Sequence, residues 1–362
     1  MKFAHFSHVW GKAALTPATR YEQLWRELEI CDHLGFDYSF CVEHHFGPLE
    51  SWMPTPAVYC ASVAARTRRL RPGPMGYVAG LYDPIRIAEE IAVLDNLSGG
   101  RLEVGMVSGI VPSYFAGYGA DFARRKEHLA EAVALLKAAT TRDAPFDFEG
   151  PFHRYHNLTL SVQPLQKPHP PLWISSRDPE LVPWMARNGI NATYVFLFPR
   201  QEAAHRYAGF LRDWRNAGHA RPPRIGYWAM VYVDETDERA VALARPQVVE
   251  AGRRFLHAEP FDVPFEEQHR KLADFFDRRG EPGEAEIFRN LLEFDYLFKR
   301  DLVFVGAPDT VAAKIRAAAA EGSFNTLFCE FNFGDLAERD LLRSIRLFGE
   351  QVMPALRSYE PF

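Results

Sequence analysis

Several features that would mark a special class of protein are missing from this sequence of 362 residues. Only four residues are cysteine, and they lie far apart, with no C-x-x-C pair and no histidine at zinc-finger spacing. A disulfide scaffold and a structural zinc site are therefore disfavoured. The cysteines stand among apolar neighbours, so we expect reduced, buried thiols in a cytoplasmic protein at Cys31, Cys41, Cys60 and Cys329.

Long apolar runs and an excess of one charge are missing as well. The longest apolar-rich stretch, 57–65, is far shorter than the roughly 18 residues of a membrane-spanning helix, and the opening MKFAHFSHVW lacks the apolar segment of a secretory signal. The 42 basic and 47 acidic residues leave a net charge of −5, which offers no basic field for a polyanion. We expect no membrane insertion, no secretion and no nucleic-acid partner.

Apolar and aromatic residues are plentiful. Apolar residues make up 47% of the chain, enough for a large core, and the aromatic share of 14% calls for an explanation of its own. Short β-branched or aromatic runs alternate with longer helical patterns, which is typical of a parallel sheet built from βα units. We predict eight strands, at 2–6, 38–42, 71–78, 102–107, 172–175, 192–198, 225–233 and 326–331.

Helix signals separate these strands. Thr16-Pro17 and Leu34-Gly35 bound the first predicted helix, and Asp178-Pro179 opens another. Further helices are predicted at 56–65, 85–97, 121–140, 201–217 and, closing the chain, 339–352. Eight units and the lack of a G-x-G-x-x-G sequence after the first strand favour an α/β fold of the (β/α)8 TIM-barrel class over an open dinucleotide-binding sheet.

Two segments do not fit the repeating pattern. Residues 142–169 are rich in Pro, Phe and His, and residues 245–301 are dense in charge and Phe. We interpret them as insertions after strands 4 and 7, the second of them lid-like, within a single domain that spans 1–362.

The carboxyl ends of barrel strands are where active sites lie, and Glu43-His44-His45-Phe46 directly follows the second strand. Side chains alternate along a strand, so one histidine is expected to face inward and the other outward. Imidazole suits proton transfer near neutral pH. The alternative is a pair of structural histidines.

Three further strand ends carry candidate residues. Gly76, after Met75 in strand three, marks either the close approach of a ligand or backbone, or a bulge. Val107-Ser108-Gly109 leads to Tyr114 and Phe115, which either wall a flat ligand or pack the loop. Ser175-Ser176-Arg177 offers hydroxyls and a guanidinium to a phosphate, unless Asp178 merely caps the helix.

Four motifs occur in the order found in one known family: EHHF at 43–46, DPIRIAEE at 83–90, LDNLSGGRLEVG at 94–105 and VGAPDTVA at 305–312. In these the chain resembles the bacterial luciferase-like flavin-dependent monooxygenases. The resemblance implies that His44, with His45 beside it, assists the flavin chemistry. Glu43 is expected to orient a histidine if it faces the same side as that histidine. The resemblance also implies a non-prolyl cis peptide under the flavin ring at Met75–Gly76.

The sequence departs from the luciferases at two cofactor positions. Val107 stands where their reactive cysteine lies, and Ser108 stands where their phosphate-side arginine lies. Ser175, Ser176 and Arg177 are then the expected phosphate contacts.

The resemblance implies an oxidoreductase that works as a two-component monooxygenase. Reduced FMN arrives as a co-substrate from a separate flavin reductase, O2 adds to it as a C4a-peroxyflavin, and an organic substrate is oxidised. A homodimer is implied through the helices at 56–65 and 84–97. Aromatic residues at strand ends predict a pocket for a bulky apolar or aromatic substrate, formed by Phe46, Tyr114, Phe115, Phe196 and Trp228.

Three alternatives stay open. Relatives on the same barrel use the deazaflavin F420 for hydride transfer. A metal-dependent hydrolase would need His5, His8, His44 and His45 to converge. A non-catalytic flavin-binding protein would need no histidine.

Overall fold

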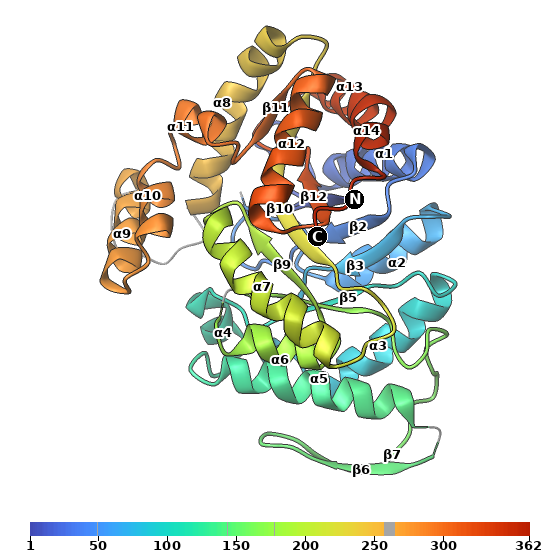
Figure 1. Ribbon diagram of the computed structural model, residues 1–362. Helices are drawn as coiled ribbons and strands as arrows, with labels where there is room; N and C mark the ends of the chain where they lie inside the picture. The colour runs from blue at the N-terminus through green and yellow to red at the C-terminus, as the bar shows by residue number, and fades with distance from the viewer. Residues whose placement is uncertain (49, 143, 177, 257–264) are drawn as a thin grey trace.

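The predicted parallel strands form one ten-stranded sheet in the computed structural model, which describes residues 1–48, 50–142, 144–176, 178–256 and 265–362 (Figure 1). The strands are β1 (Lys2–Ser7), β2 (Tyr38–Cys41), β3 (Arg71–Pro74), β4 (Tyr77–Val78), β5 (Val104–Val107), β8 (Leu172–Ser175), β9 (Asn191–Val195), β10 (Ile225–Val233), β11 (Phe304–Gly306) and β12 (Thr326–Glu330). Their order is β3-β2-β1-β12-β10-β9-β8-β5-β4, with β11 on β10. Because β3 and β4 follow each other in the chain, the sheet nearly closes into the predicted barrel.

The third predicted strand, 71–78, is broken in two. β3 pairs with β2 and β4 pairs with β5, and the cis peptide Met75–Gly76 lies between them, at the position that the family resemblance implies. A Cβ on Gly76 would lie 2.5 Å from the carbonyl carbon of Gly105. The close approach of another backbone therefore accounts for this glycine.

Helices surround the sheet, and several of them begin where the sequence signals them. They are α1 (Pro17–Leu34), α2 (Pro56–Arg66), α3 (Pro84–Leu97), α4 (Pro112–Tyr118), α5 (Arg125–Thr141), α6 (Leu181–Arg187), α7 (Arg200–Asn216), α8 (Asp237–Leu256), α9 (Phe265–Arg278), α10 (Pro282–Arg289), α11 (Phe294–Lys299), α12 (Pro308–Gly322), α13 (Glu338–Leu347) and α14 (Met353–Leu356), with a 3-10 turn at Ala79–Leu81 and a π-helical turn at Phe348–Val352. Thr16 caps α1 by accepting a hydrogen bond from the Thr19 N–H. Gly35 ends it at φ 83°, a left-handed conformation that favours glycine.

The helix predicted at 121–140 begins later. The Asp121 carboxylate accepts a hydrogen bond from the Ala123 N–H in a turn, and α5 starts only at Arg125. The unpredicted helix α4 precedes it, opened by Pro112 and ended by Gly119 at φ 68°.

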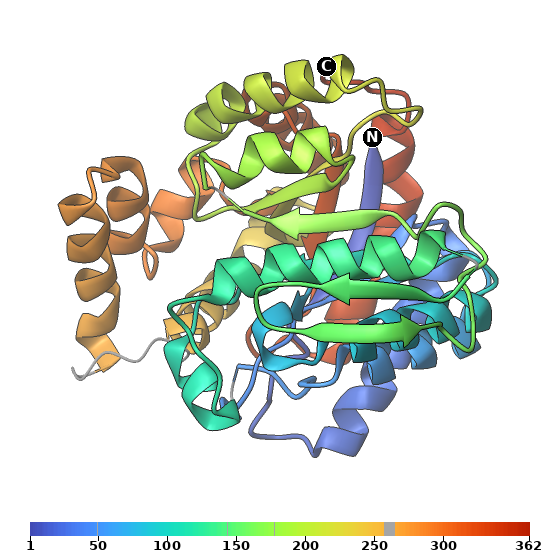
Figure 2. The ribbon, with the colours of Figure 1, turned by 90° about the horizontal axis from the view of Figure 1, so that it is seen from below.

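The two irregular segments fold outside the repeating units. Residues 142–169 contain the antiparallel hairpin of β6 (Phe146–Glu149) and β7 (Arg154–Leu158). The described residues between β10 and β11 are mainly helical, residues 257–264 of the predicted insertion lie outside the described residues, and α8 begins at Asp237, before the predicted start at 245. Figures 1 and 2 both show α9 and α10 standing off one side of the barrel.

Aromatic rings fill the barrel interior. The ring centroids of Phe40 and Phe328 lie 4.8 Å apart, and Trp173 lies 5.6 Å from Phe40 and 5.7 Å from Phe328. These side chains come from β2, β8 and β12, so part of the aromatic share is barrel core. The four cysteines are buried and free, as expected. No helix of the described residues is long and apolar enough to cross a membrane.

Candidate active site

The two adjacent histidines after β2 enter different hydrogen-bond networks. His45 is buried, with Nε2 2.8 Å from Oε1 of Glu43 and Nδ1 3.2 Å from the hydroxyl of Tyr118. Glu43 also accepts hydrogen bonds from the backbone N–H of Val78, at 2.9 Å, and the hydroxyl of Tyr82, at 2.8 Å. Because Val78 belongs to β4, this network ties the loop after β2 to the far edge of the sheet. This connection indicates that Glu43 and His45 hold the loop after β2 in place.

His44 faces a different carboxylate. Its Nδ1 lies 2.8 Å from Oε1 of Glu50 and 2.9 Å from the hydroxyl of Tyr114, which donates to Oε2 of Glu50 at 3.1 Å. The His44 side chain is 17% exposed and that of His45 only 3%. His44 is therefore the histidine of this pair that a bound molecule reaches.

The carboxyl of Glu50 is buried but favours its charged form. Burial alone would raise the pKa of Glu50, and the neighbouring His44 together with the Tyr114 hydroxyl outweigh that effect and lower it. A carboxylate at this position favours the tautomer in which Nδ1 of His44 donates. Glu50 is not among the residues predicted from the sequence, because its burial and its contact with His44 appear only in the folded loop.

A third histidine lies beside His44. His8 follows β1, and its ring centroid lies 5.6 Å from that of His44. Its Nδ1 lies 2.7 Å from Oε2 of Glu330, the last residue of β12. The indole N–H of Trp10 donates to Oε1 of Glu330 at 3.2 Å. The sequence suggested His8 only as a metal ligand and gave no role to Glu330. Both residues nevertheless stand at positions whose side chains, by the alternation along β1 and β12, point toward the inside of the barrel.

The predicted cofactor residues lie on neighbouring strand ends. Val107 ends β5 and Ser175 ends the adjacent strand β8, and these two residues, Ser108 and Ser176 are all half-buried. Hydroxyls therefore stand at two adjacent strand ends, an arrangement that fits an oxygen-rich ligand such as a flavin side chain or phosphate.

The helix-start phosphate site is not supported in the form predicted. Helix α6 has only seven residues, and Asp178 before it accepts a hydrogen bond from the Glu180 N–H, as a capping residue does. Lys126 also pairs with Asp178. The Ser176 hydroxyl accepts from the Asp178 N–H at 3.0 Å. Arg177 lies outside the described residues.

The aromatic residues predicted for a substrate pocket are spread over several places. Tyr114 belongs to the His44 network, and Trp228 lies 5.0 Å from Phe196 and 5.1 Å from His8, measured between ring centroids. Phe46 is 67% exposed, at φ 61°, and Phe115 packs in a small apolar cluster with Val78, Val111 and Tyr114. Phe46 also lies beside the site, with its ring centroid 5.8 Å from that of His45 and 6.1 Å from that of Tyr114, whereas Phe196 packs on Trp228, which itself lies beside His8.

The histidines of the metal-site alternative do not converge. His5 points from β1 to Glu27 of α1, at 3.0 Å, while His8 pairs with Glu330. Within the described ranges, no group of three or more His, Cys, Asp or Glu side chains is arranged to hold a metal ion.

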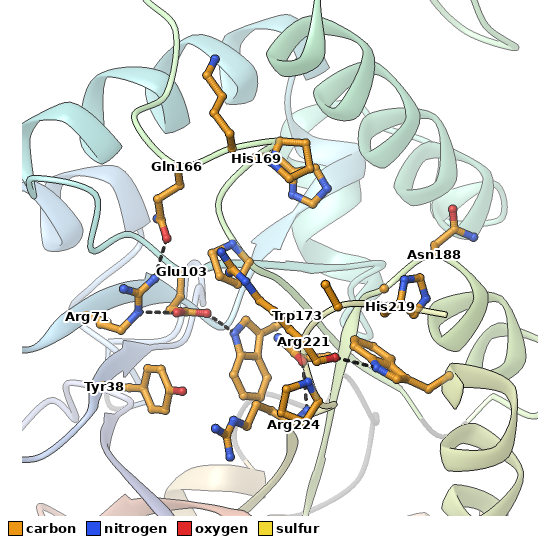
Figure 3. Close-up of a pocket in the computed structure, with 18 residues that line it drawn as sticks. Tyr38, Arg71, Glu103, Gln166, His169, Trp173, Asn188, His219, Arg221 and Arg224 are labelled. Atoms are coloured by element: carbon orange, nitrogen blue, oxygen red, sulfur yellow. Dashed lines mark hydrogen bonds and ion pairs between the residues drawn. The ribbon is translucent and has the colours of Figure 1, made fainter. Parts of the chain in front are cut away.

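A cavity lies at the opposite, amino-terminal mouth of the barrel (Figure 3). It encloses about 810 Å³ and is lined by residues at strand starts, among them Tyr38, Arg71, Glu103, Asn191 and Arg224. It is therefore separate from the histidine networks.

The chain is similar in sequence to a known family and to several known proteins. Residues 1–325 match the family model for luciferase-like monooxygenases. A Sinorhizobium fredii protein of unassigned function, y4wF, is 32% identical over 339 residues, which cover 93% of this chain and 92% of that protein. The oxygenase component of the flavin-dependent trigonelline monooxygenase of Acinetobacter baylyi is 27% identical over 248 residues, 67% of this chain and 68% of that protein.

Solved structures share the fold. The monooxygenase RslO1 from Streptomyces bottropensis superposes with a TM-score of 0.80 at 23% identity, covering 98% of this chain and 99% of its own. The FMN complex of the oxygenating constituent of 3,6-diketocamphane monooxygenase from Pseudomonas putida has a TM-score of 0.78 at 18% identity, covering 98% of both chains. The F420-dependent tetrahydromethanopterin reductase of Methanopyrus kandleri has a TM-score of 0.70 at 16% identity, covering 98% of both chains.

The chain is thus an oxidoreductase, and FMN is the cofactor that its named relatives support. With nine-tenths of its length matched by one family model, the chain belongs to the luciferase-like monooxygenases.

Proposed function

We propose that this chain is the oxygenase component of a two-component monooxygenase that takes reduced FMN from a separate reductase. One oxygen atom of O2 enters a bulky apolar or aromatic substrate. The other leaves as water with the two hydrogens of reduced FMN, and FMN is returned oxidised. The observation that carries this proposal is His44, held by Glu50 and Tyr114 at the carboxyl mouth of the barrel.

FMN fits the residues at this mouth. Its ring would lie over Met75 and Gly76, and its polar tail would lie along Val107, Ser108, Ser175 and Ser176. The half-buried hydroxyls at the ends of β5 and β8 support this placement, with Arg177 as the expected cation at the phosphate. Bound in its reduced form, FMN supplies two electrons for the activation of O2.

The protein's own contribution is proton transfer and the exclusion of water. Glu50 fixes the orientation of His44, whose Nε2 then delivers or accepts a proton at the reacting oxygen. Glu43 and His45 position the loop from behind. Phe196 and Trp228 provide an apolar wall, which limits the wasteful release of hydrogen peroxide.

The helices after β10 are proposed to cover the mouth. Phe255 of α8 stacks on Trp228, with ring centroids 5.6 Å apart, and lies 5.6 Å from His8. This contact links the segment predicted as a lid to the aromatic wall. We further propose that the chain forms a single domain, that it is cytoplasmic, and that it forms a homodimer through α2 and α3. Exposed apolar side chains support that interface: Val58, Val93 and Leu97. The molar mass in solution tests it.

A first experiment tests oxygenation itself. The protein is mixed anaerobically with chemically reduced FMN, then with O2 and either trigonelline or a panel of apolar aromatic compounds. Product and hydrogen peroxide are quantified together. His44→Ala is expected to lower the oxygenation rate by about 10²–10⁴-fold, the usual contribution of a general acid or base. His156→Ala, on the exposed hairpin, is the matched control. An unchanged rate and product yield in His44→Ala would remove His44 from the mechanism.

A second experiment separates FMN from F420, which the barrel of the Methanopyrus kandleri enzyme uses. A ligand that binds only the folded protein raises the melting temperature, and the shift grows with the logarithm of the ligand concentration above its Kd. Reduced FMN is expected to raise it and F420 to leave it unchanged. The reverse result would favour hydride transfer over oxygenation.

A further inference from the structure

Two histidine–glutamate pairs extend from the same strand into different surroundings. His5, within β1, pairs with Glu27 on the helix side of the sheet, and His8, just after β1, pairs with Glu330 on the inner side. Both pairs are buried, with side chains exposed by at most 3%. Their residue types are the same, so any difference between them comes from their neighbours.

The neighbours of Glu27 keep it charged. The Arg20 guanidinium donates to its Oε1 at 2.9 Å and the Asn332 amide donates to the same oxygen at 2.8 Å. Burial would raise the pKa of Glu27, but Arg20 and His5 outweigh burial and lower it to about 2. Glu27 therefore stays ionised over the physiological range.

The neighbours of Glu330 are uncharged donors. Trp10 donates to its Oε1, and the backbone N–H of His8 lies 3.4 Å from the same atom, while no described Lys or Arg pairs with this carboxyl. Burial raises the pKa of Glu330 to about 8 and lowers the pKa of His8 to about 3. Both directions favour a protonated Glu330 that donates to Nδ1 of a neutral His8, a tautomer that carries its own N–H at Nε2.

The charged groups around the pair lie on two sides. On the β1 and α1 side they are His5, Arg20 and Glu27, whose opposing charges act on Glu330. On the loop side His44 lowers the pKa of His8 and Glu50 raises it.

We propose that His8 and Glu330 form a second proton-holding pair of the active site, which delivers one proton through Nε2 of His8 to the oxygen atom that leaves as water. His8 is the group that faces the reacting atoms, and Glu330 is a positioning residue that acts through it. The inference rests on the proposed function. No described residue makes a hydrogen bond with Nε2 of His8, whose ring lies 5.6 Å from that of His44.

The aromatic surroundings of His8 favour direct transfer over exchange with bulk water. Its ring lies 4.5 Å from Trp10 and 5.1 Å from Trp228, measured between centroids. The indole N–H of Trp228 is buried without a hydrogen-bond partner among the described residues. It is thus available as a second donor to the same oxygen atom.

The proton count closes. Nε2 of His8 gives its proton to the departing oxygen, Nδ1 takes the proton of Glu330, and the pair is left with a glutamate anion and a neutral histidine of the other tautomer. One flavin hydrogen leaves to solvent as a proton, and one proton from solvent restores the starting state of the pair, so that the overall count of two flavin hydrogens per water is kept. No electrons move in these steps.

Infrared spectroscopy of the protein without cofactor tests where the proton is. The C=O stretch of a protonated Glu330 is expected at pH 7, is lost as the pH rises through about 8, and is missing in Glu330→Gln. Glu103→Gln is the matched control, because Glu103 is also a buried carboxyl with a raised pKa but lies at the other mouth.

The pH profile of oxygenation tests whether the proton is used. In wild type the turnover number is expected to fall above about pH 8, where the pair has lost its proton. In Glu330→Gln it should be about tenfold to a hundredfold lower at pH 7 and should lose this alkaline limb, because an amide supplies no proton. His8→Asn should behave like Glu330→Gln, whereas Glu103→Gln should keep the wild-type profile.

The outcomes separate this inference from the proposed function. If wild type forms no oxygenated product from reduced FMN and O2, the proposed function fails and the inference fails with it. If wild type forms product and Glu330→Gln keeps its rate and alkaline limb, only the inference fails. Wild-type infrared spectra without a Glu330 band at pH 7 also overturn it, and need no variant to fold.

Discussion

At the amino-terminal mouth of the barrel, Arg71 closes an ion pair with Glu103 at 2.5 Å, and the indole N–H of Trp173 donates to the same carboxylate at 2.6 Å (Figure 3). At the carboxyl mouth, no lysine or arginine of the described residues pairs with Glu50 or Glu330, and histidines take that place. Arginine stays charged at any physiological pH, so it ties strand starts together. Histidine exchanges protons near neutrality. The difference indicates that the amino-terminal mouth, where the cavity lies, is stabilised by a permanent ion pair. The carboxyl mouth carries the side chains suited to proton transfer.

The largest effect on stability is expected from removing the ion pair between Arg71 and Glu103. Arg71→Leu leaves the buried Glu103 carboxylate without its cation and should lower the free energy of unfolding by about 3 kcal/mol. Burial already raises the pKa of Glu103, and losing Arg71 raises it further. The loss should therefore be larger at pH 8 than at pH 5, where protonation relieves the buried charge. Denaturant unfolding at both pH values measures it.

Arg224→Leu is the control for this variant, because Arg224 lines the same cavity and makes no ion pair with a described carboxylate. Its stability should stay within about 0.5 kcal/mol of wild type. Both variants should keep the wild-type oxygenation rate. A large loss of turnover in either one would break the assignment of the two mouths.

The carboxyl mouth should respond in the opposite way. Glu50→Gln keeps the size of the side chain but removes the charge that orients His44, and the oxygenation rate should fall by about tenfold to a hundredfold. Stopped-flow mixing of the complex of enzyme and reduced FMN with O2 measures it. Glu149→Gln removes the same charge from the exposed hairpin and should change nothing.

The same variant also has a signature in acid. The pKa of Glu50 is lower in the folded protein than its ordinary value, so its ionised form stabilises the fold above that ordinary value. This contribution disappears as the pH falls through the folded pKa. Glu50→Gln should therefore lose less stability than wild type on acidification. An equal loss in both proteins would show that the His44 network adds nothing to folding.

The smallest effect is expected behind the histidines. Tyr82→Phe removes one of the hydrogen bonds to Glu43, which keeps those to His45 and the Val78 N–H. The free energy of unfolding should fall by about 1 kcal/mol, with little change in the oxygenation rate. Thermal unfolding and a single-turnover assay measure the two quantities. A rate loss as large as that of Glu50→Gln would move Glu43 from positioning to chemistry.

Local patterns in the sequence were sufficient for much of the barrel. Alternation and the signals at Thr16-Pro17 and Leu34-Gly35 placed β1 and α1, because these depend on neighbours in the chain. The break between β3 and β4 depends on Gly105 of another strand, so no pattern within 71–78 shows it. Pairing with β10 likewise creates β11 from only three residues.

The same limit applies to the candidate site. EHHF marked the loop that carries His44, but Glu50, the partner of His44, lies outside this motif, and the partner of His8 comes from β12. Phe115 is an aromatic residue near a strand end, which is why it was predicted to line the substrate pocket. In the structure its side chain packs in a small apolar cluster instead. Contacts between distant segments decide such roles, and alternation along one segment does not contain them.

Gly76, between β3 and β4, and Gly105, in the adjacent strand β5, restrict how this enzyme can be redesigned. A side chain on Gly76 meets the backbone of Gly105, and one on Gly105 would lie 2.2 Å from the carbonyl oxygen of Pro74. Neither position is free to change, and changing both together only adds to the crowding. A mutant library aimed at new substrates would best keep both glycines constant and place its diversity at Phe196, Trp228 and Val107.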